Sequence, residues 1–291
     1  KINEKDNLQL SYSRRINRPN FFTLIPFTDF TDSLNLRRGN PDLTPEFTNS
    51  YELTYQNIFE KGDNVLISAY YKSASDLITT YQFSEFDPSL QREVIIQTFE
   101  NSNNSYAYGM EFTTRNTFAK IFTLVSNLNV YNARVDASNI QEGLINDQFT
   151  WFLKENLQVS LPKGFTLQIN GQYQSRTAFD INSNQGRFRG FRRQATNTAQ
   201  GYTIPVWFVD VSIRKSIMKR KGTITASMSD VFGTRQTGAF ADTEFFIQET
   251  WRLRQPQVVR VNFFYRFGKA DASLFKRKNT NSGSDGGELM N

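Results

Sequence analysis

The chain of 291 residues contains no cysteine and no histidine. Without cysteine it can have neither a disulfide framework nor a thiolate metal site. Without histidine it lacks the usual imidazole metal ligand and the usual general base. A serine nucleophile would therefore have no customary partner to activate it. We expect a protein that is not an enzyme, with no catalytic residues, no metal site and no cofactor.

Long apolar runs are absent as well. No stretch of about 18 apolar residues occurs, which a transmembrane helix would need. The first ten residues lack the apolar core of a signal peptide. Because a strand pattern begins almost at once, we expect that further sequence precedes it. The net charge of +6 is modest, and we expect no nucleic-acid partner.

What the chain does have is alternation of apolar and polar residues with period two, which indicates β-strands. The stretch 259–267 reads VRVNFFYRF, with an apolar or aromatic residue at every odd position. Ten stretches alternate in this way, each of about the 9–11 residues that cross a membrane as a tilted strand. They centre on residues 8–12, 51–55, 65–71, 106–112, 122–130, 151–159, 165–174, 207–213, 224–228 and 259–267.

The connections between these stretches also alternate. Short turns fall at residues 60–63, 119–120, 162–164 and 219–222. Long polar segments, which we predict to be loops, fall at 17–46, 73–104, 133–148, 177–202 and 234–255. Short turns at one end and long loops at the other are typical of a transmembrane β-barrel.

A soluble β-sandwich is the alternative, because its strands alternate too. Sandwich strands are shorter, at about 5–6 residues, and their water-facing side is rich in Lys and Glu. Here the polar side carries mostly Gln, Asn, Ser and Thr. Aromatic residues near strand ends would form the interfacial girdles of a barrel; they are Tyr12, Tyr71, Tyr106, Tyr131, Trp151, Tyr173 and Trp207. We therefore predict an all-β, antiparallel transmembrane β-barrel with about ten strands visible.

Backbone groups in hydrocarbon must all be paired within the protein, so strands can cross only as a ring. In the last strand we expect Val259, Val261, Phe263, Tyr265 and Phe267 to face lipid. Charged residues on the other side should pair across strands in the lumen; they are Glu52, Glu111, Lys154, Asp210, Arg214, Arg260 and Arg266. Strict alternation would turn Glu155 towards lipid, unless a bulge or a position near the interface relieves it.

Three short segments resemble one family, the TonB-dependent outer-membrane receptors of the outer membrane protein β-barrel type, and the last strand resembles that of bacterial outer-membrane barrels in general. Gly39–Glu46 reads GNPDLTPE, similar to the family's G-N-P-x-L-x-P-E, and a strand with Glu52-Leu53 follows it. Arg18–Leu24 (RPNFFTL) resembles the lead-in, and Ser229–Arg235 (SDVFGTR) resembles the stretch before the last strand. Phe263, Tyr265 and Phe267 resemble the terminal signal that the barrel assembly machinery recognises. The resemblance covers about residues 5–267.

The resemblance implies the C-terminal portion of a receptor barrel of about 22 strands. Residues 1–267 would form the barrel portion, and residues 268–291 a polar, disordered tail in the periplasm. The protein would lie in the outer membrane of a Gram-negative bacterium, capture a ligand at the cell surface and import it. Energy would come from TonB through a plug domain that these residues do not contain.

Other partners implied are outer-membrane lipid, lipopolysaccharide and the barrel assembly machinery, with a surface lipoprotein as a further candidate. Two alternatives stay open. One is a barrel with a structural, adhesive or secretion role and no active import. The other is a small porin whose ten strands close by themselves.

Two groups of residues are candidates for ligand binding. Phe21, Phe22, Phe27 and Phe30 could line an apolar rim of the mouth. Four arginines interleaved with aromatic residues could bind an anion such as a ferric chelate, a phosphate or lipopolysaccharide; the segment contains Arg187, Phe188, Arg189, Phe191, Arg192 and Arg193. An ordinary solvated loop is the simpler interpretation of that basic segment, and single-stranded nucleic acid the least favoured one.

Overall fold

The main feature of the fold is one large antiparallel sheet. The computed structural model describes residues 3, 5–30, 35–59, 62–88, 91–177, 200–243, 246–253 and 257–267. Ten strands neighbour one another in chain order, matching the ten predicted stretches one to one. They are β1 (Asp6–Asn17), β4 (Glu46–Ile58), β5 (Asn64–Asp87), β6 (Arg92–Phe118), β7 (Phe122–Asp136), β8 (Ile145–Leu161), β9 (Phe165–Gln174), β11 (Val206–Ile217), β12 (Gly222–Ser229) and β15 (Val258–Tyr265).

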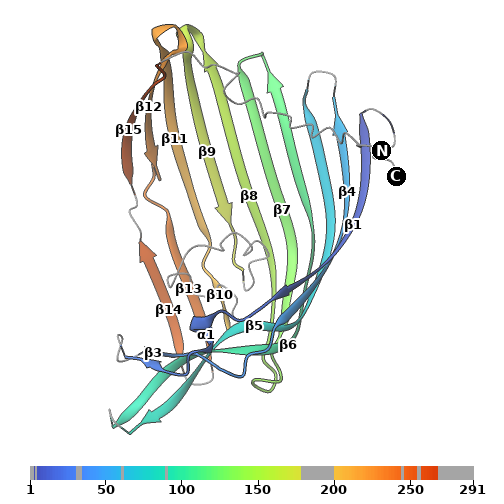
Figure 1. Cartoon of the computed structure of the whole chain (residues 1–291), viewed down its shortest axis with the longest axis vertical. Coiled ribbons are helices and arrows are strands. Elements are labelled where there is room, and N and C mark those ends of the chain that lie inside the picture. Colours follow the sequence, from blue (N-terminus) through green and yellow to red (C-terminus); the bar gives the residue numbers. More distant parts are fainter. Residues whose placement is uncertain are drawn as a thin grey trace, which may run out of the picture.

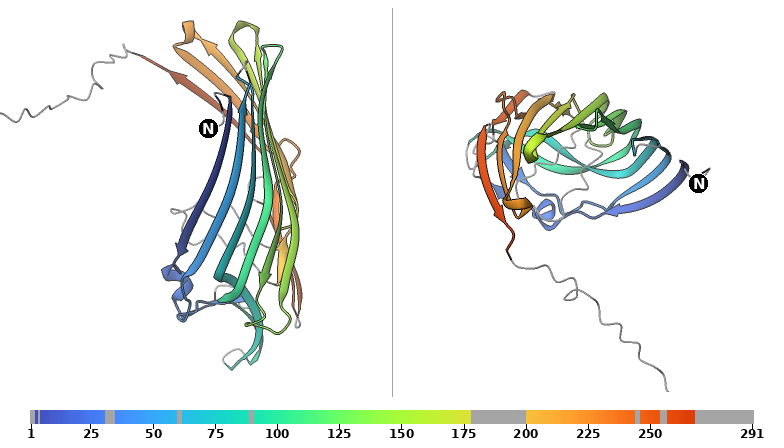
Figure 2. Two further views of the ribbon diagram at one scale, coloured as in Figure 1. Left: turned by 90° about the vertical axis from the view of Figure 1, so that its right-hand side faces the viewer. Right: turned by 90° about the horizontal axis from the view of Figure 1, so that it is seen from above.

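The sheet bends into a trough and does not close, so β1 and β15 form its two edges (Figures 1 and 2). A single curved layer is not a sandwich, and the barrel prediction is the correct one of the two. One end of the trough carries tight hairpin turns, including the 3-10 turns η1 (Pro162–Gly164) and η2 (Met218–Arg220). We call this the short-turn end and the opposite one the long-loop end.

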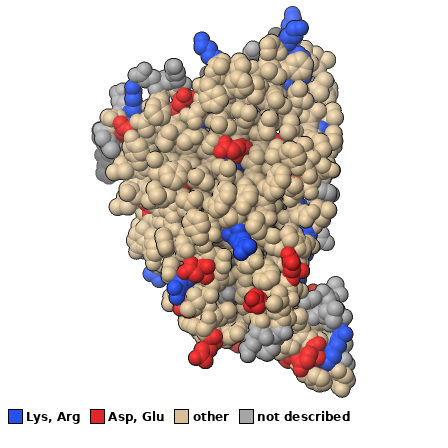
Figure 3. Space-filling view, turned by 180° about the vertical axis from the view of Figure 1, so that it is seen from behind, with Lys and Arg blue, Asp and Glu red and all other residues tan. Residues whose placement is uncertain are grey.

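The two faces of the sheet differ as alternation predicts. Cross-strand pairs put Leu10 beside Leu53, Leu53 beside Ala69, Ala69 beside Met110, and Met110 beside Val130. This apolar row lies on the convex face, whose middle is nearly free of charged side chains (Figure 3). The concave face carries polar side chains and is the predicted lumen wall.

In β15 the predicted assignment of residues to the two faces of the sheet is confirmed. Val259 pairs with Met228, Val261 with Ala226, and Phe263 with Ile224, all on the convex face. Arg260 and Asn262 therefore point to the concave side, because neighbouring side chains of a strand point to opposite faces.

Aromatic rings line up along the convex face towards the long-loop end. The ring centroids of Tyr12 and Tyr51 are 5.0 Å apart, and those of Trp151 and Tyr173 are 4.3 Å apart. This row has the arrangement of an interfacial girdle. Tyr131 was wrongly assigned to it: its neighbour Val130 belongs to the convex row, so Tyr131 is turned to the concave face and is buried there.

Glu155 does face the convex side. The register between β7 and β8 is continuous from Phe122 to Asp136, so no bulge relieves it. Instead, the carboxylate lies opposite Ser126, whose Oγ donates a hydrogen bond of 2.6 Å to Glu155 Oε2. One neutral donor thus compensates part of the cost of turning a carboxylate outwards.

The strands run well beyond the length that crosses a membrane. β5 has 24 residues and β6 has 27, so the predicted loop at 73–104 is wrong: it is a paired hairpin (Figure 1). The loop at 133–148 likewise shrinks to the eight residues 137–144 between β7 and β8. Paired strands satisfy their own backbone in water, and so they need no apolar alternation there.

Smaller elements extend the wall at the long-loop end. β10 (Gly201–Thr203), β13 (Gln236–Asp242) and β14 (Ile247–Leu253) form a second sheet, so the predicted loop at 234–255 contains a hairpin. β2 (Thr28–Asp29) pairs with β3 (Asn35–Arg38), and β3 runs parallel to β6. Among the described residues no helix is long and apolar enough to span a membrane; α1 (Phe21–Leu24) has four residues.

Candidate ligand-capture surface

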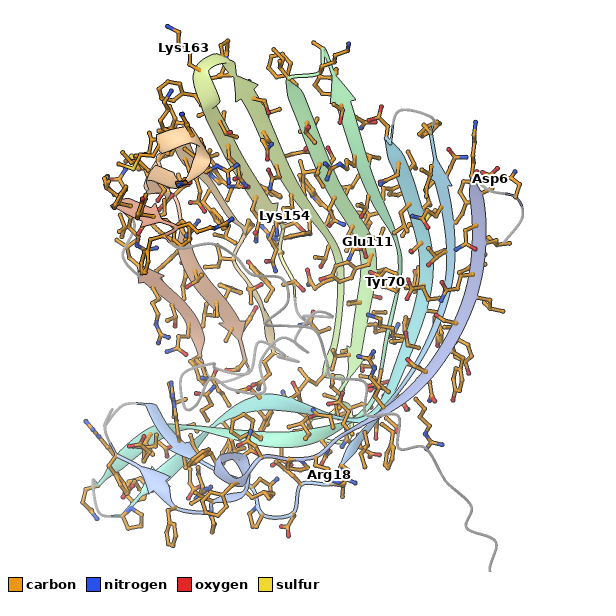
Figure 4. The ribbon with its side chains drawn as sticks, turned by 45° about the horizontal axis from the view of Figure 1, so that its top comes forward. Asp6, Arg18, Tyr70, Glu111, Lys154 and Lys163 are labelled. Atoms are coloured by element: carbon orange, nitrogen blue, oxygen red, sulfur yellow. The ribbon has the colours of Figure 1, made fainter. Side chains whose placement is uncertain are left out.

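The concave face is a hydrogen-bonded polar wall. Tyr70 Oη donates to Asn129 Oδ1 over 2.9 Å, and Lys72 Nζ lies 5.1 Å from the centroid of the Tyr70 ring. Asn127 Nδ2 donates to Glu111 Oε1 over 2.6 Å. Tyr70 and Glu111 lie with Lys154 on this wall, well away from both ends of the strands (Figure 4). Polar groups anchored in this way present a fixed set of donors and acceptors to a solute.

Where the structure shows their partners, the lumen charges predicted to pair with one another across strands are satisfied in other ways. Asp210 forms an ion pair with Arg235, whose Nη2 lies 2.7 Å from Asp210 Oδ1. Arg235 comes from the segment after β12 and not from a facing strand position. Glu52 accepts from the neutral hydroxyl of Thr54 over 3.1 Å, so its partner also differs from the expected cation.

The β5–β6 hairpin bends across the trough at the long-loop end (Figures 1 and 4). Its contact with the far wall is specific: Gln200 Oε1 accepts from the backbone N–H of Gln82 over 2.8 Å, and Gln200 Nε2 donates to the carbonyl of Gln82 over 2.9 Å. Gln200 is buried and directly precedes β10. The hairpin therefore forms a strap over the mouth, which sequence periodicity could not show because neither glutamine belongs to an apolar pattern.

The four predicted phenylalanines lie in the connection between β1 and β4, at the long-loop end. Phe21 and Phe22 belong to α1, and their ring centroids are 5.6 Å apart. Asn20 Oδ1 caps this turn by accepting from the backbone N–H groups of Phe22 and Thr23. Phe27 and Phe30 flank β2 and are 80% and 57% exposed. Exposed rings at the mouth fit an apolar rim, and their binding role stays a prediction.

The GNPDLTPE segment packs directly against the connection that carries these rings. The N–H of Gly39 donates to the carbonyl of Ile25 over 2.9 Å, and the N–H of Asn40 donates to that of Thr23 over 2.7 Å. A Cβ at position 39 would lie 2.4 Å from the Ile25 oxygen, so no residue with a side chain fits without a shift. Two of the segments that carry the family resemblance thus contact each other.

The same segment is anchored to β6, and we call this set of contacts the clasp. Asn40 Nδ2 donates to the Phe99 carbonyl over 2.9 Å and to Glu100 Oε2 over 3.1 Å. Asn101 Oδ1 accepts from the backbone N–H of Thr44, and its Nδ2 donates to the Thr44 carbonyl. The clasp couples the aromatic rim to the strap. The sequence marked Asn40 by resemblance alone and gave no sign of Asn101.

At the long-loop end, the carboxyl groups of Glu100 and Asp136 have shifted pKa values. Burial raises the pKa of Glu100, and the nearby charge of Asp42 raises it further. Hydrogen bonds from the Ser138 side chain and backbone lower the pKa of Asp136. Within the described part of the chain, no group of three or more acidic side chains is arranged to hold a metal ion.

The SDVFGTR segment forms a tight turn that joins the two sheets. Asp230 is fully buried, with φ of 52°, and its carboxylate accepts from the backbone N–H groups of Thr234 and Arg235. Its own N–H donates to Asp210 Oδ1 over 2.8 Å. The Arg235 guanidinium lies 3.6 Å from the centroid of the Phe208 ring, on the concave side. The segment therefore fixes the wall where β12 ends.

The remaining predicted residues divide into two groups. The arginine-rich segment with Arg187, Phe188, Arg189, Phe191, Arg192 and Arg193 lies outside the described residues, as does the tail 268–291. Phe263 and Tyr265 end β15, and Phe267 follows it with 85% of its surface exposed. Their role as an assembly signal stays a prediction.

The family model of the outer membrane protein beta-barrel family matches residues 1–265. The chain belongs to this family. Its place is therefore the outer membrane, with the short-turn end towards the periplasm and the long-loop end outside the cell. No curated protein gives a significant match.

Solved structures with a similar fold include two receptors from Pseudomonas aeruginosa. The siderophore receptor PirA from Pseudomonas aeruginosa has a TM-score of 0.56 at 12% identity, over 91% of this chain and 40% of PirA. A mutant of the ferric enterobactin receptor PfeA from the same organism has a TM-score of 0.51 at 15% identity, over 80% of this chain and 33% of PfeA. The chain thus spans well under half of these receptors, and at this identity the likeness shows the fold.

Proposed function

We propose that this chain forms part of the wall and the outer mouth of a receptor that captures a ligand at the cell surface for TonB-coupled import. The strap carries this proposal: the β5–β6 hairpin crosses the mouth and is bonded at Gln200 on the far wall. A bonded element across the entrance obstructs free diffusion, which favours a receptor over a wide pore. A receptor needs such a surface to hold a ligand over the lumen.

In this proposal the exposed rings of the rim contact apolar parts of the ligand. Polar groups of the concave wall, including Tyr70 and Glu111, meet it further down. Ferric siderophores are the first ligand class to test, because the structural neighbours PirA and PfeA are siderophore and ferric enterobactin receptors. The arginine-rich segment 187–193 would add an anion-binding element.

We further propose that residues 1–267 are the C-terminal portion of a larger barrel. The edges β1 and β15 each present unpaired backbone groups, which hydrocarbon does not tolerate. About a dozen further strands would close a ring of about 22. Residues 268–291 would then follow the last strand into the periplasm.

The test is ligand uptake by the protein expressed from its whole reading frame in a deletion strain. Cells are given radiolabelled iron bound to catecholate, hydroxamate or citrate chelators, with and without depletion of TonB. We expect saturable uptake of one chelate that disappears without TonB and weakens when Phe21 and Phe22 are both replaced by Ala. Uptake that is linear in concentration and indifferent to TonB would identify a porin and contradict the proposal.

A further inference from the structure

Three turns at the periplasmic end place a lysine in the left-handed backbone region. Lys120 has φ of 57°, Lys163 has φ of 57° and Lys219 has φ of 51°. Each has a neighbour that also has positive φ, as in type I′ turns, which favour Asn and Gly. Lysine is uncommon in this conformation, so turn geometry does not explain its use three times.

These lysines lie where the apolar band of the convex face ends. Lys120 lies in the sequence between Phe118 and Ile121, whose side chains are both exposed. Lys163 is exposed and lies at the tip of the β8–β9 turn, two residues before Phe165 (Figure 4). Lysine stems can cover apolar surface while the amino group reaches the polar boundary.

A fourth lysine with the same kind of position lies on the strand β11, which pairs with β9. Lys215 Nζ lies 3.8 Å from the centroid of the Phe165 ring and donates a hydrogen bond to the carbonyl of Lys163. Its amino group is therefore held against an aromatic ring of the convex face and beside the β8–β9 turn.

The charge of these three turns has one sign. Residues 118–122, 161–165 and 214–222 contain seven Lys or Arg and no Asp or Glu. The turn between β4 and β5 differs, since it carries Glu60 and Asp63. In Figure 3 basic side chains project from the top, periplasmic edge, and towards its left side they are mixed with acidic ones. The edge that carries basic and no acidic residues is thus the part of the wall from β6 to β12.

We propose that this edge, defined by Lys120, Lys163, Lys215, Lys219 and Lys221, binds the phosphate headgroups of anionic phospholipids in the periplasmic leaflet. Lysine binds phosphate as a point charge, and basic side chains beside a bilayer favour anionic lipids. The occupant is a lipid because the apolar side chains next to each lysine would contact its acyl chains. A soluble acidic partner would leave these apolar contacts unused.

The test titrates phosphatidylglycerol and phosphatidylcholine onto the detergent-solubilised protein, expressed from its whole reading frame, and counts bound lipids by native mass spectrometry. Asparagine suits the left-handed region, so Lys120→Asn, Lys163→Asn and Lys219→Asn together remove charge and keep the turns. We expect wild type to prefer phosphatidylglycerol, and the triple variant to lose about tenfold or more of that preference. Lys→Arg at the same positions should keep it.

The matched control removes three exposed arginines at the opposite end, with Arg14→Asn, Arg15→Asn and Arg92→Asn, and should keep the preference. An equal loss in this control, or an unchanged preference in the asparagine variant, overturns the proposal. Binding of each variant to purified cell-wall sacculi is measured as well. The proposal is also overturned if the triple asparagine variant loses this binding while its preference for phosphatidylglycerol is unchanged. Heat-modifiable mobility in gels verifies folding, and a glycine variant of the same turns replaces the asparagine variant if that one fails to fold.

Discussion

At the scale of single residues, Gly39 has the most demanding position in the clasp. Its Cα faces the backbone of Thr23–Ile25 so closely that any Cβ would overlap the Ile25 carbonyl. The hydrogen bonds of Gly39 and Asn40 to Ile25 and Thr23 depend on that approach. The glycine of the family-like segment is therefore needed for packing and not for an unusual φ.

We expect Gly39→Ala to release the clasp while the barrel wall stays folded. The reason is that the new methyl group must displace a backbone that lies outside the membrane band. Hydrogen exchange should then rise at residues 20–25 and 39–44 and stay unchanged in β7 and β8. A matched variant is Gly62→Ala: its Cβ would meet nothing within 4 Å, although its φ of 81° adds some strain. Unchanged exchange at the clasp would contradict this prediction.

Glu100 makes the clasp sensitive to pH. Its pKa in the folded protein lies above the ordinary value of 4.5 because of burial, with a further contribution from Asp42. A folded-state pKa above the unfolded one gives a stabilisation that is complete below the unfolded pKa and is lost as pH rises through the folded pKa. The clasp should therefore be weaker at neutral pH than in mild acid.

We expect Glu100→Gln to slow hydrogen exchange in the clasp at pH 7 and to have no effect on it at pH 4. The amide keeps an acceptor oxygen for Asn40 Nδ2 and carries no charge to repel Asp42. Hydrogen exchange of residues 39–44 at the two pH values measures the effect. Asp136→Asn serves as the comparison. Because the pKa of the Asp136 carboxyl is lowered, its charged form stabilises the fold, and this substitution should reduce local protection from hydrogen exchange at pH 7. Equal protection of Glu100→Gln at both pH values would disprove the role of the charge.

At the scale of elements, the strap contacts both β3 and the far wall. Towards β3 it has strand pairing with β6, a buried cluster of Leu36, Val94 and Ile96, and an ion pair between Arg38 and Glu85. Towards the far wall, the Gln200 side chain forms two hydrogen bonds with the Gln82 backbone. Contacts of this small size open first, so this far contact is the part of the strap best suited to open when a ligand enters.

We expect Gln200→Ala to loosen the strap, with a local cost of about 1–3 kcal/mol because two backbone groups of Gln82 lose a buried partner. Limited proteolysis near the hairpin tip at residues 88–91 should accelerate, while the global unfolding midpoint changes little. Gln200→Glu is the informative companion, since it keeps the acceptor for the Gln82 N–H and loses the donor. Proteolysis at the wild-type rate in both variants would show that the strap is held elsewhere.

At the scale of the whole molecule, the bilayer decides which polar residues are tolerated on the convex face. Glu155 lies on it four residues from Trp151 in the aromatic row, opposite Ser126, inside the apolar band. A carboxylate facing lipid is unfavourable to a degree that depends on its depth. The hydrogen bond from Ser126 reduces this cost and does not remove it.

We expect Glu155→Leu combined with Ser126→Ala to raise the free energy of unfolding in lipid vesicles by about 1–2 kcal/mol. Both changes are made together so that no hydroxyl is left without its partner. Urea unfolding followed by tryptophan fluorescence gives the measurement. As a control, Glu111→Leu on the concave wall should destabilise, because Asn127 loses its acceptor. A lower stability of the double variant would mean that Glu155 has a partner in the membrane.

The site was less predictable than the wall. The rim phenylalanines and the SDVFGTR segment could be selected from the sequence, but their contacts could not. Gln82 and Gln200 are 118 positions apart, and Asn40 and Asn101 are each joined to partners that no local pattern indicates. Such contacts arise because strands of unequal length bring distant loops to one end of the wall.

The ten crossing strands could be predicted from the sequence, and so could the face of most of their residues, Tyr131 excepted, because side-chain direction along a strand has a fixed period and the bilayer sorts the two faces. It did not determine how far the strands continue outside the membrane, since paired backbone in water needs no apolar marker. Three features could be learned only from the folded protein: a hairpin crosses the mouth, Gly39 and Asn40 clasp it to the aromatic rim, and Glu155 stays outward beside Ser126. Those outcomes depend on the curvature of the sheet, which brings together residues far apart in the chain.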